Sequence, residues 1–186
     1  MQNDINPAES RAQNLIQLGV DFSSMSRVFK DGSKAKIRDR IHGAREQLSS
    51  IESREEFDEW HSIICNWGIS NIQLAKGVRP ASYGQIAKTL NVVLKVAVYY
   101  GHLPNCEKAT QLSSWLHAAV DNKMMRMLKR SFPDAISTWP KSIQQVDSSE
   151  KYGAIQELVG RYIAEFHPNI TPVQFDDIYW WKLNKS

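Results

Sequence analysis

The chain has 186 residues, of which 42% are hydrophobic and 23% charged, and it contains six Trp, six Tyr and six Phe. This composition predicts a packed globular protein and excludes an intrinsically disordered chain. No apolar stretch reaches the roughly 20 residues that a transmembrane helix needs. The first residues, MQNDINPAES, lack the apolar run of a secretory signal. We therefore expect no membrane association and a cytoplasmic location.

The formal net charge is only +3, but the basic residues are unevenly distributed. Residues 27–45 hold seven Lys or Arg against two Asp, residues 60–106 contain no Asp or Glu, and 123–130 form a third basic segment. Acidic residues gather instead in 52–59 and from 134 onward. A fold that joins the basic segments would present one positive face to a polyanion. The alternative is that these charges lie on separate solvated helix faces.

The first strong helix signal lies at residues 53–67. The motif SREE at 53–56 has the form of a capping box, and apolar residues from Phe57 to Trp67 then recur at helical spacing. Gly68 suits the C-terminal end of this helix. The next stretch, AKGVRPASYGQ, contains two Gly and one Pro. It predicts a hairpin-like break before the next long element.

The segment 84–101 is ambiguous in type. Its four Val favour a strand, whereas its length and the spacing of Leu90, Val93, Leu94 and Ala97 favour a helix. We predict a helix here, because the apolar run continues beyond the usual length of a strand.

The rest of the chain also carries helix signals. Asp121 is placed to cap a helix that ends near Pro133, and 149–166 is an amphipathic segment. The aromatic tail from 171 onward predicts a last helix that docks Phe175, Ile178, Tyr179 and a Trp on the core. The predicted class is all-α, as one helical domain over 1–186. Two lobes are the alternative, built from a basic segment 1–50, a central region 53–130 and C-terminal helices 134–186.

The order of a helix, a hairpin, AKTLNVVLKVAVYY and AAVDNKMMRML resembles the helix-hairpin-helix base-excision DNA glycosylases. It is most similar to the archaeal 8-oxoguanine DNA glycosylase branch, over residues 53–130 and the aromatic C-terminal helix. The resemblance implies a helix-hairpin-helix centre, DNA as the partner and excision of a damaged base as the activity. It also implies two catalytic residues, with Lys88 attacking the sugar and Asp121 lying at a helix N-terminus across the pocket.

This chemistry makes demands on both residues. A lysine nucleophile must be neutral, whereas a free Lys titrates at roughly 10.4. Burial beside Ile86 and Leu90 would lower the pKa of Lys88, and the Asp121 carboxylate would stabilise positive charge on the sugar as the base departs. Two plainer interpretations stay open. Lys88 and Lys95, seven residues apart, would cover apolar surface with their stems, and Asp121 would be a simple N-cap.

The DNA contacts expected from this interpretation come from basic, turn and aromatic residues. Nucleic-acid-binding candidates are Lys34, Lys36, Arg38, Lys76, Arg79, Ser82 and Tyr83. Candidates for stacking on a flipped base are Trp67, Trp180 and Trp181, together with Tyr83. Ser82 and Tyr83 would donate to DNA phosphates from the hairpin, or they simply form the turn.

Other chemistries have weaker support. The five His residues share no ligand spacing, and the two Gly of the hairpin form no phosphate loop. No metal and no cofactor are therefore expected. Cys65 and Cys106 are expected to be small buried side chains, because they form neither a metal spacing nor a disulfide framework.

The sequence therefore predicts a DNA-binding protein that excises a damaged base through a lysine Schiff base. The first alternative is a non-enzymatic helical module that binds nucleic acid or another partner. The second alternative is a helical subunit whose basic face contacts an acidic protein. The discriminating observation is whether Lys88 and Asp121 face one pocket.

Overall fold

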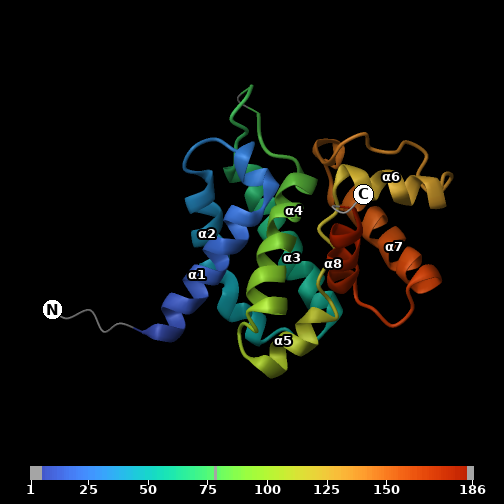
Figure 1. The fold of residues 1–186 in the computed structure, drawn as a ribbon. Helices are drawn as coiled ribbons and strands as arrows, with labels where there is room; N and C mark the ends of the chain where they lie inside the picture. Colours follow the sequence, from blue (N-terminus) through green and yellow to red (C-terminus); the bar gives the residue numbers. More distant parts are fainter. Residues whose placement is uncertain (1–5, 78, 184–186) are drawn as a thin grey trace.

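The computed structural model describes residues 6–77 and 79–183, and this part of the chain is all-α (Figure 1). The α-helices are α1 (Pro7–Phe22), α2 (Ser33–Ala44), α3 (Arg54–Asn71), α4 (Tyr83–Leu94), α5 (Cys106–Ser113), α6 (Asn122–Ser131), α7 (Ser149–Phe166) and α8 (Pro172–Leu183). Short 3₁₀ turns η1 (Ser24–Arg27), η2 (Arg45–Ser49) and η4 (Ile143–Gln145) and a π-helix, η3 (Lys95–Tyr100), complete the elements. Within the described ranges, strand-like pairing is limited to two isolated bridges.

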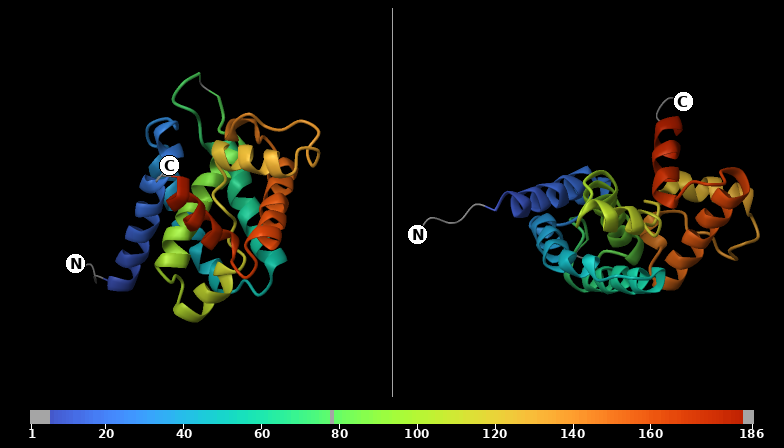
Figure 2. Two further views of the ribbon diagram at one scale, coloured as in Figure 1. Left: turned by 45° about the vertical axis from the view of Figure 1, so that its right-hand side comes forward. Right: turned by 90° about the horizontal axis from the view of Figure 1, so that it is seen from below.

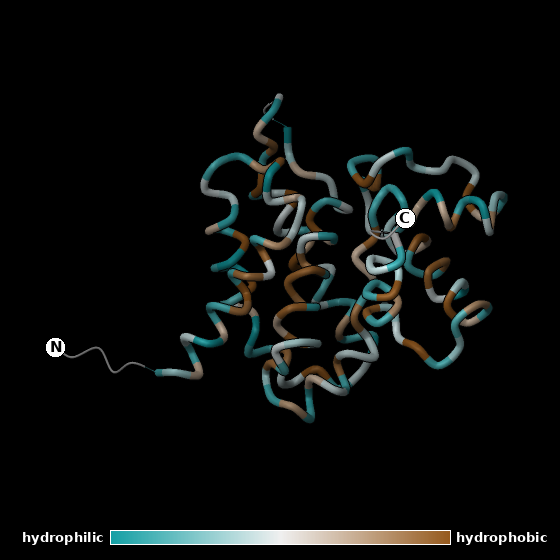
Figure 3. The backbone as a smooth tube through the Cα atoms, in the orientation of Figure 1, coloured by the Kyte–Doolittle hydropathy of each residue, from teal (hydrophilic) through white to brown (hydrophobic). Residues whose placement is uncertain are grey.

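The helices form two groups that α8 joins (Figures 1 and 2). Helices α1, α2, α3 and α5 lie around the central α4, while α6 and α7 lie together on the other side. Helix α8 lies between the groups and contacts α7. One cluster of buried apolar side chains nevertheless runs from α1 through α4 to α7 and α8. The hydrophobic stretches of α4 stand out at the centre of Figure 3.

Helix α4 confirms the prediction of a helix in the ambiguous segment. Ser82 caps it, since its hydroxyl accepts from the Gln85 N–H while the Gln85 side chain accepts from the Ser82 N–H. Most residues of α4 are buried, which explains why its apolar pattern runs almost all the way round. The helix continues as the π-helix η3, which ends at Tyr100 and has Gly101 as its C-cap.

Helix α3 starts as predicted but ends later. Ser53 caps it through the Glu56 N–H, and Glu56 in return accepts from the N–H of Glu52. The prediction that Gly68 ends this helix is wrong, because α3 continues to Asn71. Gly68 serves close packing instead, since a Cβ there would lie 2.5 Å from Cγ2 of Ile86 in α4.

The three C-terminal helices confirm the sequence pattern, with one correction. Asp121 caps α6 by accepting a hydrogen bond from the N–H of Met124. Helix α8 docks Phe175 into the core, but it places Trp180 and Trp181 at the surface, 61% and 66% exposed. The expectation that a Trp of this helix packs on the core is therefore wrong. The aromatic tail contributes Phe175 and Tyr179 to the core, whereas both Trp side chains face solvent.

The two cysteines differ in environment. Cys65 in α3 is buried, as expected, but Cys106 at the start of α5 is exposed. The prediction of two buried cysteines is thus wrong for Cys106. None of the helices in the described part of the chain combines the length and the apolar character that a membrane crossing requires.

The basic segments lie on different parts of the molecule. Helix α2 carries most of segment 27–45 and lies at the opposite end from α6, with α4 between them (Figures 1 and 2). The connection between α3 and α4 projects from the same end of the helices as the 22–33 turn. The bridge between Phe29 and Leu74 joins these two segments. Positive charge is therefore distributed over separate surfaces.

Candidate functional site

Lys88 and Asp121 are near enough for their charges to interact. Lys88 is in the second turn of α4 and is half-buried, and Asp121 is the N-cap of α6. Burial lowers the pKa of Lys88, and the carboxylates of Asp121 and Asp176 act against this shift. Lys88 takes part in no ion pair of the described residues. The two predicted catalytic residues are therefore within electrostatic reach of each other and of Asp176, but neither lines any of the four pockets found among the described residues.

Lys95 has a different environment although it lies on the same helical stretch. Its ammonium donates to Asp176 at 2.7 Å and also pairs with Asp177, both from α8. Burial by itself lowers the pKa of Lys95, but these two contacts outweigh it and raise that pKa above its ordinary value. A cation held charged in this way is a structural link between η3 and α8 and a poor nucleophile. Lys95 does not lie along the surface as the plainer interpretation supposed.

Asp176 belongs to this group of charges although the sequence analysis did not select it. Its side chain is 8% exposed, so it is among the few acidic groups of the described chain that are buried. It lies within reach of both Lys95 and Lys88. The DD pair of the last helix was visible in the sequence, but only the position of α8 beside η3 shows that both carboxylates pair with Lys95 and that Asp176 also acts on Lys88.

The predicted nucleic-acid contacts of α2 lie at its surface. Lys34 pairs with Asp21 at 3.0 Å and Arg38 pairs with Asp39 at 2.7 Å. Lys36 is exposed. Two of the three cations are thus partly neutralised by neighbours within the chain, and solvent-exposed pairs of this kind contribute little to stability.

The other predicted contacts lie in or beside the connection between α3 and α4. Lys76 and Arg79 are exposed on the projecting loop. Ser82 caps α4 and donates its hydroxyl hydrogen to the carbonyl of Ile143. Tyr83 is buried in the core at 3% exposure, so it is not available to a DNA phosphate or a base without a rearrangement. Two of these four side chains are available at the surface.

The three Trp candidates for base stacking also differ. Trp67 is partly buried, and the guanidinium of Arg40 lies 5.7 Å from the centre of its ring. Trp180 and Trp181 are exposed on α8. The last two lie four and five residues after Asp176 on this helix.

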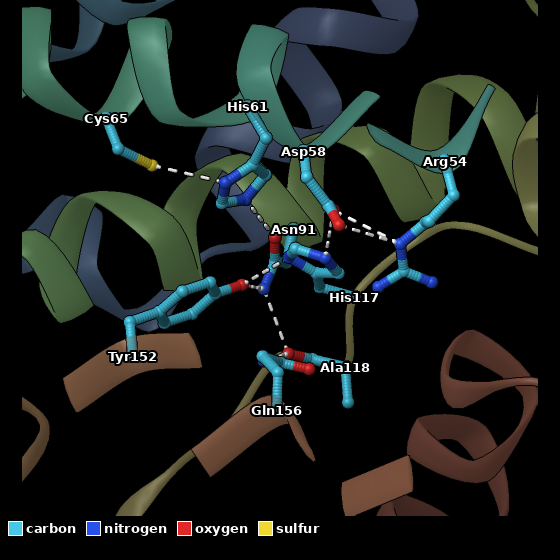
Figure 4. Close-up of polar contacts among 9 residues, drawn as sticks. All are labelled: Arg54, Asp58, His61, Cys65, Asn91, His117, Ala118, Tyr152 and Gln156. Atoms are coloured by element: carbon cyan, nitrogen blue, oxygen red, sulfur yellow. Dashed lines mark hydrogen bonds and ion pairs between the residues drawn. The ribbon is translucent and has the colours of Figure 1, made fainter. Parts of the chain in front are cut away.

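A second polar site, absent from the sequence-based candidates, lies between α3, α4 and α7 (Figure 4). His61 and His117 approach each other with ring centroids 4.7 Å apart, and His61 stacks on Tyr152 at 5.5 Å. Asn91 of α4 connects them, because it bonds to His61 on one side and to Tyr152 on the other. The group borders a pocket of about 440 Å³.

One assignment of hydrogens satisfies every member of this network. The Asn91 amide donates to the Tyr152 hydroxyl and to the Ala118 carbonyl. The Tyr152 hydroxyl then donates to Nδ1 of His117, whose Nε2–H donates to Asp58. On the other side, Nε2–H of His61 donates to the Asn91 carbonyl oxygen.

The thiol of Cys65 completes the network by donating to Nδ1 of His61 at 3.6 Å. Burial raises the pKa of this thiol well above its ordinary range and lowers the pKa of His61 to about 3. Cys65, His61 and Asn91 thus have the order of a thiol, base and amide triad. A thiol that is fully buried and protonated is nevertheless inert as a nucleophile.

His117 is also unsuited to proton transfer with a ligand. Burial lowers its pKa, against the effect of Asp58, so the ring is neutral. Both of its nitrogens are already bonded to protein groups, one to Tyr152 and one to Asp58. A general base needs a free nitrogen within reach of a substrate. The network therefore serves to fix α3, α4, α7 and the 117–118 segment to one another.

Sequence reasoning missed this network for a definite reason. His61 and Cys65 are one helical turn apart, but Asn91, His117 and Tyr152 come from distant parts of the chain. Spacing rules for metal or catalytic motifs search within short windows and cannot detect such a cluster. The available signal was weak: His61 lies on the apolar face that Phe57 and Ile64 define.

Comparison of the chain with protein-family models, with curated proteins and with solved structures finds no match. The functional assignment therefore depends on the geometry of the sites.

Proposed function

We propose that the protein binds DNA and excises a damaged base, with Lys88 as the nucleophile and Asp121 as the supporting carboxylate. The observation that carries the proposal is the state of Lys88. Its amine is half-buried and burial lowers its pKa, although the charges of Asp121 and Asp176 oppose this shift. Lys88 makes no ion pair among the described residues, whereas Asp176 is paired with Lys95. A lysine in this state is closer to the neutral form that nucleophilic attack requires.

The arrangement suits a reaction at the sugar carbon that carries the base. The neutral amine of Lys88 would form a bond to this carbon while the bond to the base breaks, and the base would leave with the electron pair and take up a proton. One amine proton is passed to the departed base. The bond between the sugar carbon and the ring oxygen then breaks as the nitrogen forms a double bond to the carbon, and the ring oxygen takes up the second amine proton, which gives the Schiff base. The Asp121 and Asp176 carboxylates would stabilise the positive charge that develops on the sugar.

The connection between α3 and α4 supports the same proposal. Helix α3, an 11-residue connection at 72–82 and helix α4 follow one another in the order of a helix-hairpin-helix element. Lys76 and Arg79 are exposed on this connection, where a DNA backbone would approach. Lys88 lies in the second turn of the helix that follows.

Borohydride trapping on duplexes with oxidised or deaminated bases tests the chemistry. The matched variants are Lys88→Arg and Lys95→Arg, because arginine keeps the positive charge at each position but cannot form a Schiff base. We expect a covalent protein–DNA product with the wild type and with Lys95→Arg, and none with Lys88→Arg. Asp121→Asn should slow excision by about 10²-fold or more while keeping the cap of α6.

The second candidate is a non-enzymatic nucleic-acid-binding protein. It is favoured by the exposure of Lys36, Lys76 and Arg79 and of the Trp pair on α8, none of which requires chemistry. Duplex binding that weakens steeply with salt, together with no trapped product, would support this candidate over the enzyme. No binding at low ionic strength would remove both.

A further inference from the structure

A pocket of about 530 Å³ lies between α6, α7 and α8 and differs from the site at Lys88. Three of its cations come from one face of α6, where Lys123, Arg126 and Arg130 recur at intervals of three and four residues. Lys182 of α8 adds a fourth from the other side, and His167 follows the end of α7. Two helices thus direct positive charge into one cavity.

The same pocket has an aromatic wall. Tyr162 of α7 and Tyr179 of α8 line it with partly exposed rings, whereas Phe175 of α8, which also borders it, is only 2% exposed. Their rings contact one another, with centroids 5.6 Å apart for Tyr162 and Phe175 and 5.9 Å for Phe175 and Tyr179. The two partly exposed tyrosine rings are suited to stacking on a planar ring of a ligand, and Phe175 supports them from the core.

Among the described residues, no carboxylate lines the pocket to balance its charge. The two acidic residues of α8, Asp176 and Asp177, lie on another side of that helix and pair with Lys95. Within the described part of the chain, none of the four cations of the pocket takes part in an ion pair. Converging cations repel each other, and an anionic ligand relieves this repulsion.

We propose that this pocket binds a nucleotide, with its phosphate on the cations of α6 and its base stacked on the aromatic wall. The arginines suit this role because their guanidinium groups contact phosphate oxygens in pairs. The volume lies within the roughly 300–1,000 Å³ of small-molecule pockets. The nucleotide is either a free mononucleotide or the 5′-phosphorylated end of a strand, since both carry the same groups. The proposal does not depend on chemistry at Lys88.

Calorimetric titration with AMP, adenosine and inorganic phosphate tests the pocket. We expect AMP to bind more tightly than either part alone, because only AMP engages both the cations and the rings. The double variant Arg126→Gln and Arg130→Gln should weaken AMP binding about tenfold or more. Lys129→Gln is the matched control, since Lys129 is an exposed cation on the same helix that does not line the pocket.

Binding of short single strands with and without a 5′-phosphate distinguishes a free mononucleotide from a strand end as the ligand. Tighter binding of the phosphorylated strand than of AMP assigns the pocket to a strand end, and the reverse order assigns it to a free nucleotide. Absence of AMP and strand binding at millimolar concentration overturns the proposal, and so does an equal loss in Lys129→Gln. Phosphate binding as tight as that of AMP also overturns it, because the aromatic wall would then play no part. Borohydride trapping at Lys88 is a separate measurement, so its result does not decide whether this pocket binds a nucleotide.

Discussion

Lys88 and Lys95 show how strongly neighbours decide the chemistry of one residue type. Both lie on one continuous helical stretch, and both are partly buried. Lys95 meets two carboxylates of α8, which keep it charged, whereas burial lowers the pKa of Lys88. The sequence identified both lysines as unusual because no acid lies near them in the chain. It could not show that α8 supplies one of them with partners.

The same contrast at the residue scale predicts the reactivity of the two thiols. Cys65 is buried and its pKa is raised, while Cys106 is exposed. A thiol reagent such as 5,5′-dithiobis(2-nitrobenzoate) should label one cysteine in the native protein and two in denaturant. Cys106→Ser should abolish the native reaction. Fast native labelling of Cys65 in that variant would contradict the buried network around His61.

At the scale of elements, the crossing of α1 and α4 depends on a glycine. A Cβ at Gly19 would lie 2.6 Å from the Cα of Val93, a contact with backbone that cannot move aside cheaply. Gly19→Ala should therefore destabilise the protein by about 1–3 kcal/mol, measured by urea unfolding.

Gly160 provides the matched control for this crossing. It lies in α7, and a Cβ there would meet nothing within 4 Å. Gly160→Ala should leave stability unchanged or raise it by up to about 1 kcal/mol, because alanine favours the helix. A similar loss of stability in both variants would show that replacing a helical glycine is destabilising in itself, independently of the α1–α4 contact.

Periodicity and capping signals predicted the individual elements better than their packing. The spacing of apolar residues gave α3, α4, α6, α7 and α8, and the caps at Ser53 and Asp121 are confirmed. Errors arose where tertiary contacts decided the outcome. Gly68 continues a helix because Ile86 packs against it, and the Trp pair of α8 is exposed because Phe175 and Tyr179 occupy the core.

The candidate sites also differ in whether a local sequence pattern or the tertiary structure reveals them. Lys88 and Asp121 were found from the sequence because each stands at a recognisable place in a helix. The network of His61, Asn91 and Tyr152 was not, because hydrogen bonds between residues 30 to 61 positions apart leave no local pattern. Tyr83 was misplaced as a surface residue for a related reason, since the capping motif before it does not reveal which side of α4 is covered.

At the scale of the whole molecule, the buried histidines predict how stability depends on pH. The pKa of His61 falls from an ordinary value of 6.5 to about 3 in the folded protein, and burial also lowers that of His117. The unfolded chain therefore binds more protons than the folded one as the pH falls below 6.5. Stability that is present at neutral pH must be lost progressively toward pH 3.

Guanidinium unfolding at pH 7.5 and pH 5.0 measures this loss. His61 alone should lower the free energy of unfolding by about 2 kcal/mol between these two values, and His117 adds to it. The lowered pKa of Asp58 acts only at more acidic pH, since its ordinary value is 3.8. His61→Gln should flatten the dependence, whereas His102→Gln, at an exposed ring, should retain it. Burial raises the pKa of Asp176, which acts in the opposite direction, so the comparison with His61→Gln decides. The same pH dependence in the wild type and in His61→Gln would mean that His61 accepts a proton in the folded state, and the hydrogen-bond assignment of the network would then be wrong.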